Sequence, residues 1–242
     1  MSQLIQSQSI QSQPMIFHII GLGVSQTAQL SPQAINALQQ ADSVLGSARQ
    51  IAVIESHLML QPTSQMAQQK TQQKTHHFPK FSELPAWLEA QQTNGHKNIV
   101  ILASGDPLYF GIGRWFSQQY PTNQLHFYPA VSSIQAACHE LGLSLQDVDV
   151  ISLHGRPLKT LRRYIKQNQT LLMLTDHNST PAALAKECQQ LGFIKGQLHV
   201  CEKLGYDDQT VRTFELNDPQ ISQLDFDPLH VSIISTQHCE GY

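Results

Sequence analysis

Short apolar runs alternate with helix-like segments in the first part of the chain. The run at 15–23, MIFHIIGLG, is rich in Ile and ends in two glycines, which is typical of a buried parallel strand that leads into a loop. Ser31 and Pro32 then predict a helix N-cap followed by proline at the first helical position. A second short strand, SVLGS, is predicted at 43–47. The pattern therefore predicts a unit of strand, loop, helix and strand.

The alternation continues to about residue 129, where a first α/β domain is expected to end. The predicted elements are helices at 83–92 and 111–120, a central strand that starts at 97 and stops at the turn 104–107, and a further strand at 125–129. The polar segment 61–80 has no period, so we expect a long surface loop or a poorly formed helix there. Its adjacent histidines, His76 and His77, are expected to be solvated.

The pattern changes in the second half of the chain. The predicted elements are helices at 133–143, 157–168 and 180–192 and strands at 149–155 and 170–176. Three further strand-like runs, at 197–204, 209–216 and 230–236, have no long helix between them, which indicates a mixed sheet with hairpins. We therefore expect an α/β fold with a disordered tail at 1–14 and two α/β domains, at 15–129 and 130–242.

Charge and composition limit the classes of function. Lys and Arg total 15 and Asp and Glu total 18, a net charge of −3 with no basic block to offset it, so no nucleic-acid partner is expected. The apolar runs fall far short of the roughly 20 residues that span a bilayer, and the N-terminus lacks a secretory signal. We predict a cytoplasmic protein without a membrane anchor. The four cysteines are far apart and lack zinc-binding spacing, so buried, reduced thiols and no metal site are expected.

Three glycine- or serine-bearing loops follow predicted strands. The first, with Gly21 and Gly23, lacks the third glycine of a dinucleotide fingerprint, and no acidic residue follows the second strand, so an NAD-binding domain is disfavoured. Two glycines still let a backbone approach a ligand closely. The second loop, SGDPLYFGIG at 104–113, contains a Gly-Asp-Pro turn that is either structural or ligand-binding. In the third, Ser132 and Ser133 precede a helix, where one of them is expected to serve as an N-cap.

In a parallel sheet, loops after successive strands lie at one edge, and ligands bind at that edge. The loops at 21–25, 104–113 and 130–133 are therefore expected to form one site.

At these residues the sequence resembles the tetrapyrrole (corrin and porphyrin) methylases, which take a methyl group from S-adenosylmethionine. The resemblance extends from about Met15 to Thr236. Its carriers are IIGLG, LSPQAINALQQADSVLGSAR, ILASGDPLYFGIG, YPAVSSIQAACHELGL, VISLHGRP and CEKLGYDDQTV. The ASGDP and GIG pattern together with SLHGR is most similar to the branch that methylates C5 of precorrin intermediates in cobalamin synthesis. The resemblance implies two α/β domains with the cofactor in the cleft between them, and a homodimer.

The resemblance also implies roles for individual residues in binding the cofactor. Gly21 and Gly23 would let the backbone of the first loop approach the cofactor, and the backbone of Ser104 and Gly105 would line the cofactor's methionine tail. The remaining cofactor contacts it implies are the Asp106 carboxylate with the methionine ammonium, the Ser132 and Ser133 hydroxyls, and Thr175 near the adenosine from the second domain. Methyl transfer from a sulfonium mainly requires placement and exclusion of water, so no metal or covalent nucleophile is expected.

A corrin precursor bears many carboxylates, so the cleft is expected to offer cations. His154 and Arg156, in LHGR at a strand end, are the first candidates. His154 is a candidate to remove the proton released on methylation, with a structural histidine as the alternative. The basic residues of the next helix, Lys159, Arg162 and Arg163, are expected to form a solvated face.

Two alternatives stay open. Related methylases act on other ring carbons, on ribosomal RNA or on a modified histidine, and a non-catalytic protein that holds cofactor or corrin is the other alternative. The non-catalytic alternative is kept because Val24 and Ser25 replace the Pro and Gly common in the family's first loop. Some members carry a second domain for C15 methylation and decarboxylation. Because the chain ends at Tyr242 without a further strand-glycine loop, we expect only the C5 step, with a separate protein for C15.

Overall fold

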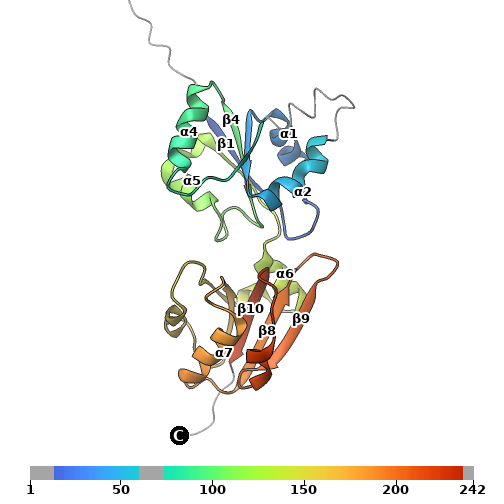
Figure 1. Cartoon of the computed structure of the whole chain (residues 1–242), viewed down its shortest axis with the longest axis vertical. Coiled ribbons are helices and arrows are strands. Elements are labelled where there is room, and N and C mark those ends of the chain that lie inside the picture. Colours follow the sequence, from blue (N-terminus) through green and yellow to red (C-terminus); the bar gives the residue numbers. More distant parts are fainter. Residues whose placement is uncertain (1–13, 60–73, 237–242) are drawn as a thin grey trace, which may run out of the picture.

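The computed structural model describes residues 14–59 and 74–236 and contains two β-sheets, one above the other along the long axis of the molecule (Figure 1). The predicted disordered tail lies outside the described residues except for Pro14, which is exposed. Cys239 also lies outside them, whereas Cys138, Cys188 and Cys201 are buried and free, as expected.

The first sheet is parallel throughout, with the strand order β3-β2-β4-β1-β5. Its strands are β1 (Ile16–Gly21), β2 (Ser43–Gly46), β3 (Thr75–His77), β4 (Asn98–Ala103) and β5 (Leu125–Tyr128). The apolar run of β4 is buried on both faces and lies at the centre of the sheet, as the sequence predicted.

Two helices cover each face of the first sheet. One pair is α1 (Pro32–Gln40) and α2 (Ala48–Met59), and the other is α4 (Leu84–Thr93) and α5 (Gly113–Gln119) (Figure 1). The start of α1 follows from its sequence, because the Ser31 hydroxyl accepts the Ala34 N–H at 3.2 Å and Pro32 occupies the first turn.

The second sheet is mixed, with the strand order β6-β7-β10-β8-β9. Its strands are β6 (Asp149–Ser152), β7 (Thr170–Leu174), β8 (Gly196–Glu202), β9 (Thr210–Glu215) and β10 (His230–Thr236). Strands β6 and β7 are parallel and all other pairs are antiparallel, so the prediction of a mixed sheet is confirmed. Helix α7 (Pro181–Gln190) packs on one face of this sheet, and α6 (Ser133–Glu140) packs on the other.

Short 3₁₀ helices complete the described chain: η1 (Thr122–Gln124), η2 (Leu145–Asp147), η3 (Leu158–Arg163) and η4 (Pro219–Gln223). The long basic helix predicted at 157–168 is therefore wrong, and only η3 forms there. Its end is tight because the Leu161 carbonyl accepts the N–H groups of both Tyr164 and Ile165. Asn168 then takes a φ of 52°, which a continuing helix does not allow.

The polar segment before α4 also differs from its prediction. Residues 75–77 form β3, an edge strand that pairs with β2, and His76 is half-buried with its ring 5.3 Å from Trp87. His77 is exposed, as expected. A three-residue edge strand has no apolar alternation, so only pairing with β2 reveals it.

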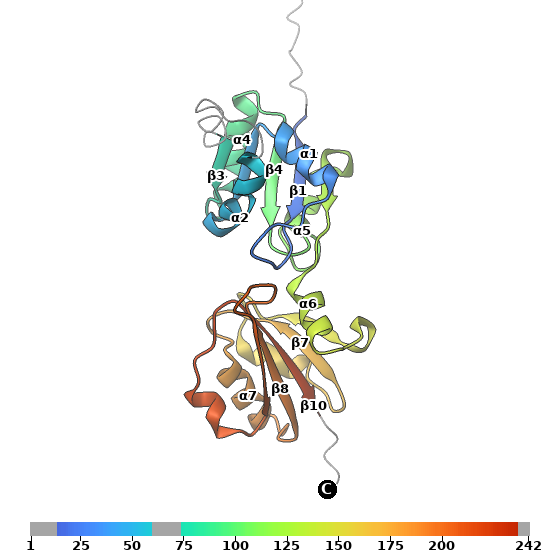
Figure 2. The same cartoon turned by 90° about the vertical axis from the view of Figure 1, so that its right-hand side faces the viewer.

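The chain passes from the first sheet to the second just before α6 (Figure 2). Ile134, Ala137 and Cys138 of α6 pack with Leu172 and Ile233 of the second sheet. The domain boundary between residues 129 and 130 stays a prediction.

Candidate functional site

The loops after β1 and β4 meet at the carboxyl edge of the first sheet, which faces the second sheet (Figure 2). Gly23 and Gly105 form an isolated antiparallel bridge, in which the Gly105 N–H donates to the Gly23 carbonyl at 3.3 Å. A side chain at Gly21 would collide with the carbonyl oxygen of Gly105. Gly105 has a φ of 65°, and a Cβ there would lie 3.0 Å from Ser132 Cα. The three loops therefore pack together, and glycine is what permits it.

A cavity of about 220 Å³ lies between these loops and the second sheet. On the first-sheet side it is lined by Gly23, Val24, Arg49, Ser104, Gly105, Tyr109 and Phe110. The opposite wall comes from Ser132, Ser133 and Ile134 before and in α6, and from the ends of β7, β8 and β10. Apolar side chains such as Leu174, Leu204 and Val231 make up much of that wall.

A larger cavity, of about 740 Å³, adjoins the first and shares Ser104, Ser133 and His230 with it. It reaches the end of β6, where Ser152 lines it, and the loop that follows, where His154 and Arg156 line it. Thr175, after β7, and Arg114 of α5 also line it. Two separate halves of the chain therefore enclose both cavities.

The turn that carries His154 and Arg156 is held by a carboxylate. Gly155 has a φ of 67°, and its N–H donates to Asp176 Oδ2 at 2.8 Å. Hydrogen bonds from the Gly155 N–H and the Ser179 hydroxyl lower the pKa of the Asp176 carboxyl to about 2. The Arg156 guanidinium donates from Nη1 to the Ser152 carbonyl at 3.0 Å, so one edge of the fork is anchored.

The charged side chains among the described residues that line the two cavities are all arginines. Arg49, Arg114 and Arg156 line the two cavities, and the described residues that line them include no aspartate or glutamate. A site with this lining attracts anions although the chain carries a net charge of −3.

Residues 17–220 match the family of tetrapyrrole (corrin/porphyrin) methylases. The chain belongs to this family. The match covers the first sheet, strands β6 to β9 of the second sheet and most residues that line the two cavities of this tetrapyrrole methylase, whereas β10 and residues 228–231 lie beyond it.

Among known relatives, the chain is 29% identical over 201 residues to a precorrin-6Y C(5,15)-methyltransferase (decarboxylating) from Sinorhizobium, covering 81% of this chain and 44% of that protein. It thus spans less than half the length of that relative. The cobalt-precorrin-7 C(5)-methyltransferase of Salmonella typhimurium is 24% identical over 204 residues, covering 80% of this chain and 87% of that protein.

Solved structures show the same fold. The precorrin-6Y methylase of cobalamin biosynthesis from Archaeoglobus fulgidus has a TM-score of 0.62 at 19% identity, covering 93% of this chain and 99% of that one. The uroporphyrin-III C-methyl transferase from Thermus thermophilus, complexed with S-adenyl homocysteine, has a TM-score of 0.65 at 21% identity, covering 91% and 97%. The expected tetrapyrrole methylase fold, with two α/β halves, is thereby confirmed.

The tetrapyrrole methylase brings most of the predicted site residues to the cavities. The smaller cavity is lined by Gly23, Ser104, Gly105, Ser132 and Ser133, and the larger by Ser104, Ser133, His154, Arg156 and Thr175. Gly21 and Asp106 are outside the residues that line either cavity.

Asp106 and Ser132 each have a local structural role. Asp106 Oδ1 accepts the N–H groups of Leu108 at 2.8 Å and Tyr109 at 3.0 Å. These bonds give the Gly-Asp-Pro segment the structural role in a turn that was one of its two interpretations. Ser132 forms a capping box with Gln135 at the start of α6. That Asp106 also binds the cofactor's ammonium stays a prediction.

Several lining residues were not found from the sequence. Arg49 follows β2, where only an acidic residue was sought, and it donates to Ser104 Oγ at 2.9 Å and to the Tyr206 hydroxyl at 3.3 Å. Tyr109 and Phe110 lie within the second loop but are exposed aromatic residues without a motif of their own. His230 begins the last strand, and no local signal marks it.

No group of three or more His, Cys, Asp or Glu side chains in residues 14–59 and 74–236 is placed to hold a metal ion. Within the same ranges, no helix has the length and apolar character needed to cross a membrane.

Proposed function

We propose that this chain transfers a methyl group from S-adenosylmethionine to C5 of a precorrin intermediate in cobalamin biosynthesis. The observation that supports this most is the pair of joined cavities between the two sheets, one small and partly apolar, the other large and lined by arginine. A relative named for C(5) methylation matches 80% of this chain and 87% of its own length, which favours C5 as the ring position.

The smaller cavity fits the cofactor chemically. Ile134, Leu174 and Val231 offer an apolar surface for a flat base. The Ser133 hydroxyl and the backbone of Gly23 and Gly105 offer polar groups for the remainder. When bound, the cofactor supplies an electrophilic methyl group on a sulfonium. Ser104, Ser133 and His230, which line both cavities, would hold the methyl-bearing end of the cofactor toward the larger cavity.

The larger cavity fits a substrate with several carboxylates. Arg156 and Arg114 lie on opposite halves of the molecule, so each can bind a different carboxylate. His154 adds a further donor on the same turn as Arg156. Holding the ring in line with the methyl group is worth roughly 7 to 11 kcal/mol of the barrier, which lets placement supply much of the catalysis.

The test is titration calorimetry of the purified chain with S-adenosylmethionine, followed by incubation with the corrin intermediate and ¹³C-methyl-labelled cofactor. We expect one binding site per chain and a ¹³C label at C5. A label at another carbon contradicts the ring position. Binding of cofactor and corrin without any transfer favours the non-catalytic binding protein, the alternative that Val24 in the wall of the smaller cavity keeps open.

A cytoplasmic location, a homodimer and a separate protein for the C15 step stay predictions.

A further inference from the structure

His230 and Thr175 lie together in the wall of the larger cavity. Thr175 Oγ1 is 3.0 Å from His230 Nε2, and His230 also lines the smaller cavity. The two residues come from β10 and from the end of β7, which are neighbouring antiparallel strands. The pairing of these two strands therefore brings the two side chains within hydrogen-bond distance.

The hydrogen-bond partners determine which nitrogen of His230 carries the proton. His230 Nδ1 is 2.7 Å from the Asp227 carbonyl oxygen, which can only accept a hydrogen bond. Nδ1 is therefore the donor. In the neutral ring Nε2 is then the acceptor, and it receives the hydroxyl proton of Thr175. A hydroxyl whose proton points at a basic nitrogen is prepared to take up a proton on its free side.

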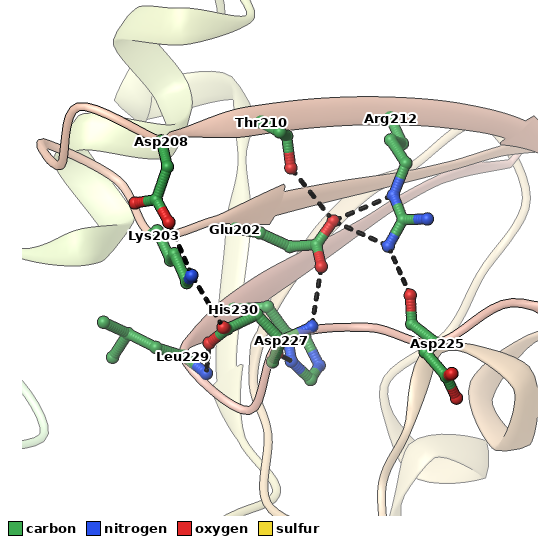
Figure 3. Close-up of polar contacts among 9 residues, drawn as sticks. All are labelled: Glu202, Lys203, Asp208, Thr210, Arg212, Asp225, Asp227, Leu229 and His230. Carbon is green, nitrogen blue, oxygen red and sulfur yellow. Dashed lines mark hydrogen bonds and ion pairs between the residues drawn. The ribbon is translucent and has the colours of Figure 1, made fainter.

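The Asp227 carbonyl is itself held in place by a polar network between β8 and the segment that precedes β10 (Figure 3). The buried Glu202 carboxylate accepts the Asp227 N–H at 2.7 Å, and its other oxygen accepts Arg212 Nε and Nη2, both at 2.8 Å. The Asp227 carboxylate accepts the Leu229 N–H at 2.8 Å and lies 3.3 Å from Lys203 Nζ. The backbone that orients His230 is therefore held through both the N–H and the carboxylate of Asp227.

We propose that Thr175 and His230 form a proton relay that takes up the proton released by methylation, an inference that rests on the proposed function. The electron pair of the ring carbon forms the new C–C bond, and the S–CH₃ bond breaks with its pair left on sulfur. The ring is left with one positive charge and loses a proton to Thr175 Oγ1, while the hydroxyl proton moves to His230 Nε2. The imidazole becomes an imidazolium and passes the proton to solvent.

The charges around His230 fit this cycle. Asp227 faces the ring from its own segment, and hydrogen bonding by the Leu229 N–H, with smaller effects of Lys203 and His230, lowers the pKa of the Asp227 carboxyl. Glu202 lies opposite His230 in the β8 and β10 register. The other charged or titratable groups among the described residues that line the same cavities as His230 are Arg49, Arg114, Arg156, His154, Tyr109, Cys201, Asp176, His177 and Asp225. Asp227 is three positions before His230 and Glu202 is its strand partner, and these two carboxylates are paired with Lys203 and Arg212.

The first test needs no turnover. ¹⁵N NMR of the histidine side chains in the free chain is expected to show the neutral His230 ring as the Nδ1–H tautomer. Thr175→Val is expected to shift the Nε2 resonance, and Thr175→Ser to leave it near its wild-type position. A His230 ring protonated on Nε2 rather than Nδ1 overturns the relay.

The second test is single-turnover methylation as a function of pH. His230→Gln and Thr175→Val are expected to lower the rate about 100-fold, the usual worth of general base catalysis. Cofactor affinity and substrate KM are measured in parallel, so that the loss of rate can be assigned to the chemical step and not to binding. The rate of the wild type is expected to depend on pH in a way that is lost in His230→Gln, and Thr175→Ser should restore most of the rate lost in Thr175→Val.

The chain offers a matched control in a second histidine and threonine pair. His199 Nδ1 lies 2.9 Å from Thr213 Oγ1 on β8 and β9, and neither residue is among those that line the cavities. His199→Gln is expected to keep the wild-type rate. If wild type turns over and His230→Gln matches it, or loses rate only through weaker cofactor binding, the relay is overturned while the proposed function stands. A wild-type chain that neither binds cofactor nor transfers methyl overturns both.

Discussion

Arg156 shows how a single side chain can be assigned to one of two ligands. It lines the larger cavity and is outside the residues that line the smaller one. Its Nη1 is anchored on the Ser152 carbonyl, and its backbone N–H donates to the Leu153 carbonyl at 2.9 Å. The rest of the guanidinium fork is left to bind a carboxylate, a geometry that lysine does not reproduce.

Arg156→Lys is expected to raise the KM for the corrin about tenfold, because one charge-assisted hydrogen bond is worth about 1.5 kcal/mol or more. Affinity for S-adenosylmethionine, measured by calorimetry, is expected to stay at its wild-type value. Arg163→Lys, on the exposed end of η3, is the control and should change neither quantity. An unchanged KM in Arg156→Lys would withdraw the substrate role of Arg156.

At the scale of elements, α6 joins the two halves of the site. Ser132, the N-cap residue, is buried, caps the helix and lines the smaller cavity, whereas Ser133, the first residue of the helix, lines both cavities and makes no capping bond. The capping box uses the Ser132 hydroxyl, which accepts the Gln135 N–H at 3.2 Å, and the Gln135 side chain, which accepts the Ser132 N–H at 2.9 Å.

Replacing each serine separately is expected to split stability from binding. Ser132→Ala should lower the free energy of unfolding by about 1 kcal/mol, the typical worth of an N-cap, measured by urea denaturation. Ser133→Ala should keep the stability within about 0.5 kcal/mol of wild type and weaken cofactor binding. Equal stability losses in both variants would contradict this division.

At the scale of the whole molecule, partly buried histidines couple stability to pH. His18 on β1 lies with Nδ1 2.9 Å from the Tyr128 hydroxyl, and its ring stacks on His126 with centroids 5.2 Å apart. Burial, and then the neighbouring His126, lowers the pKa of His18 below its ordinary value of 6.5. Burial also lowers the pKa of His76 and of His199.

A lowered histidine pKa means that the unfolded chain binds protons more readily than the folded one. Stability is therefore expected to be full above about pH 6.5 and to fall as the pH drops below it. Urea denaturation at a series of pH values between about 8 and 5 measures this fall. His18→Gln should make the dependence shallower, and an identical pH dependence in wild type and His18→Gln would show that His18 does not contribute.

Local features of the chain were predictable because they depend on neighbours in sequence. The spacing of apolar residues predicts the buried strands. The residue types at helix ends predict the Ser31 cap and the turn at Gly192, which has a φ of 88°. The edge strand at 75–77 and the end of η3 were missed, since pairing with β2 and tertiary packing decide them.

The sequence by itself determined the alternation of strands and helices, the mixed second sheet and the three loops at one sheet edge, because short-range periodicity and glycine conformations encode them. The tertiary structure alone decided which side chains face the site from a distance. Arg49 reaches Tyr206 across 157 positions of the chain, and Thr175 meets His230 across 55. Such contacts depend on strand order and on the packing of one half against the other, and no local pattern of residues specifies either of these.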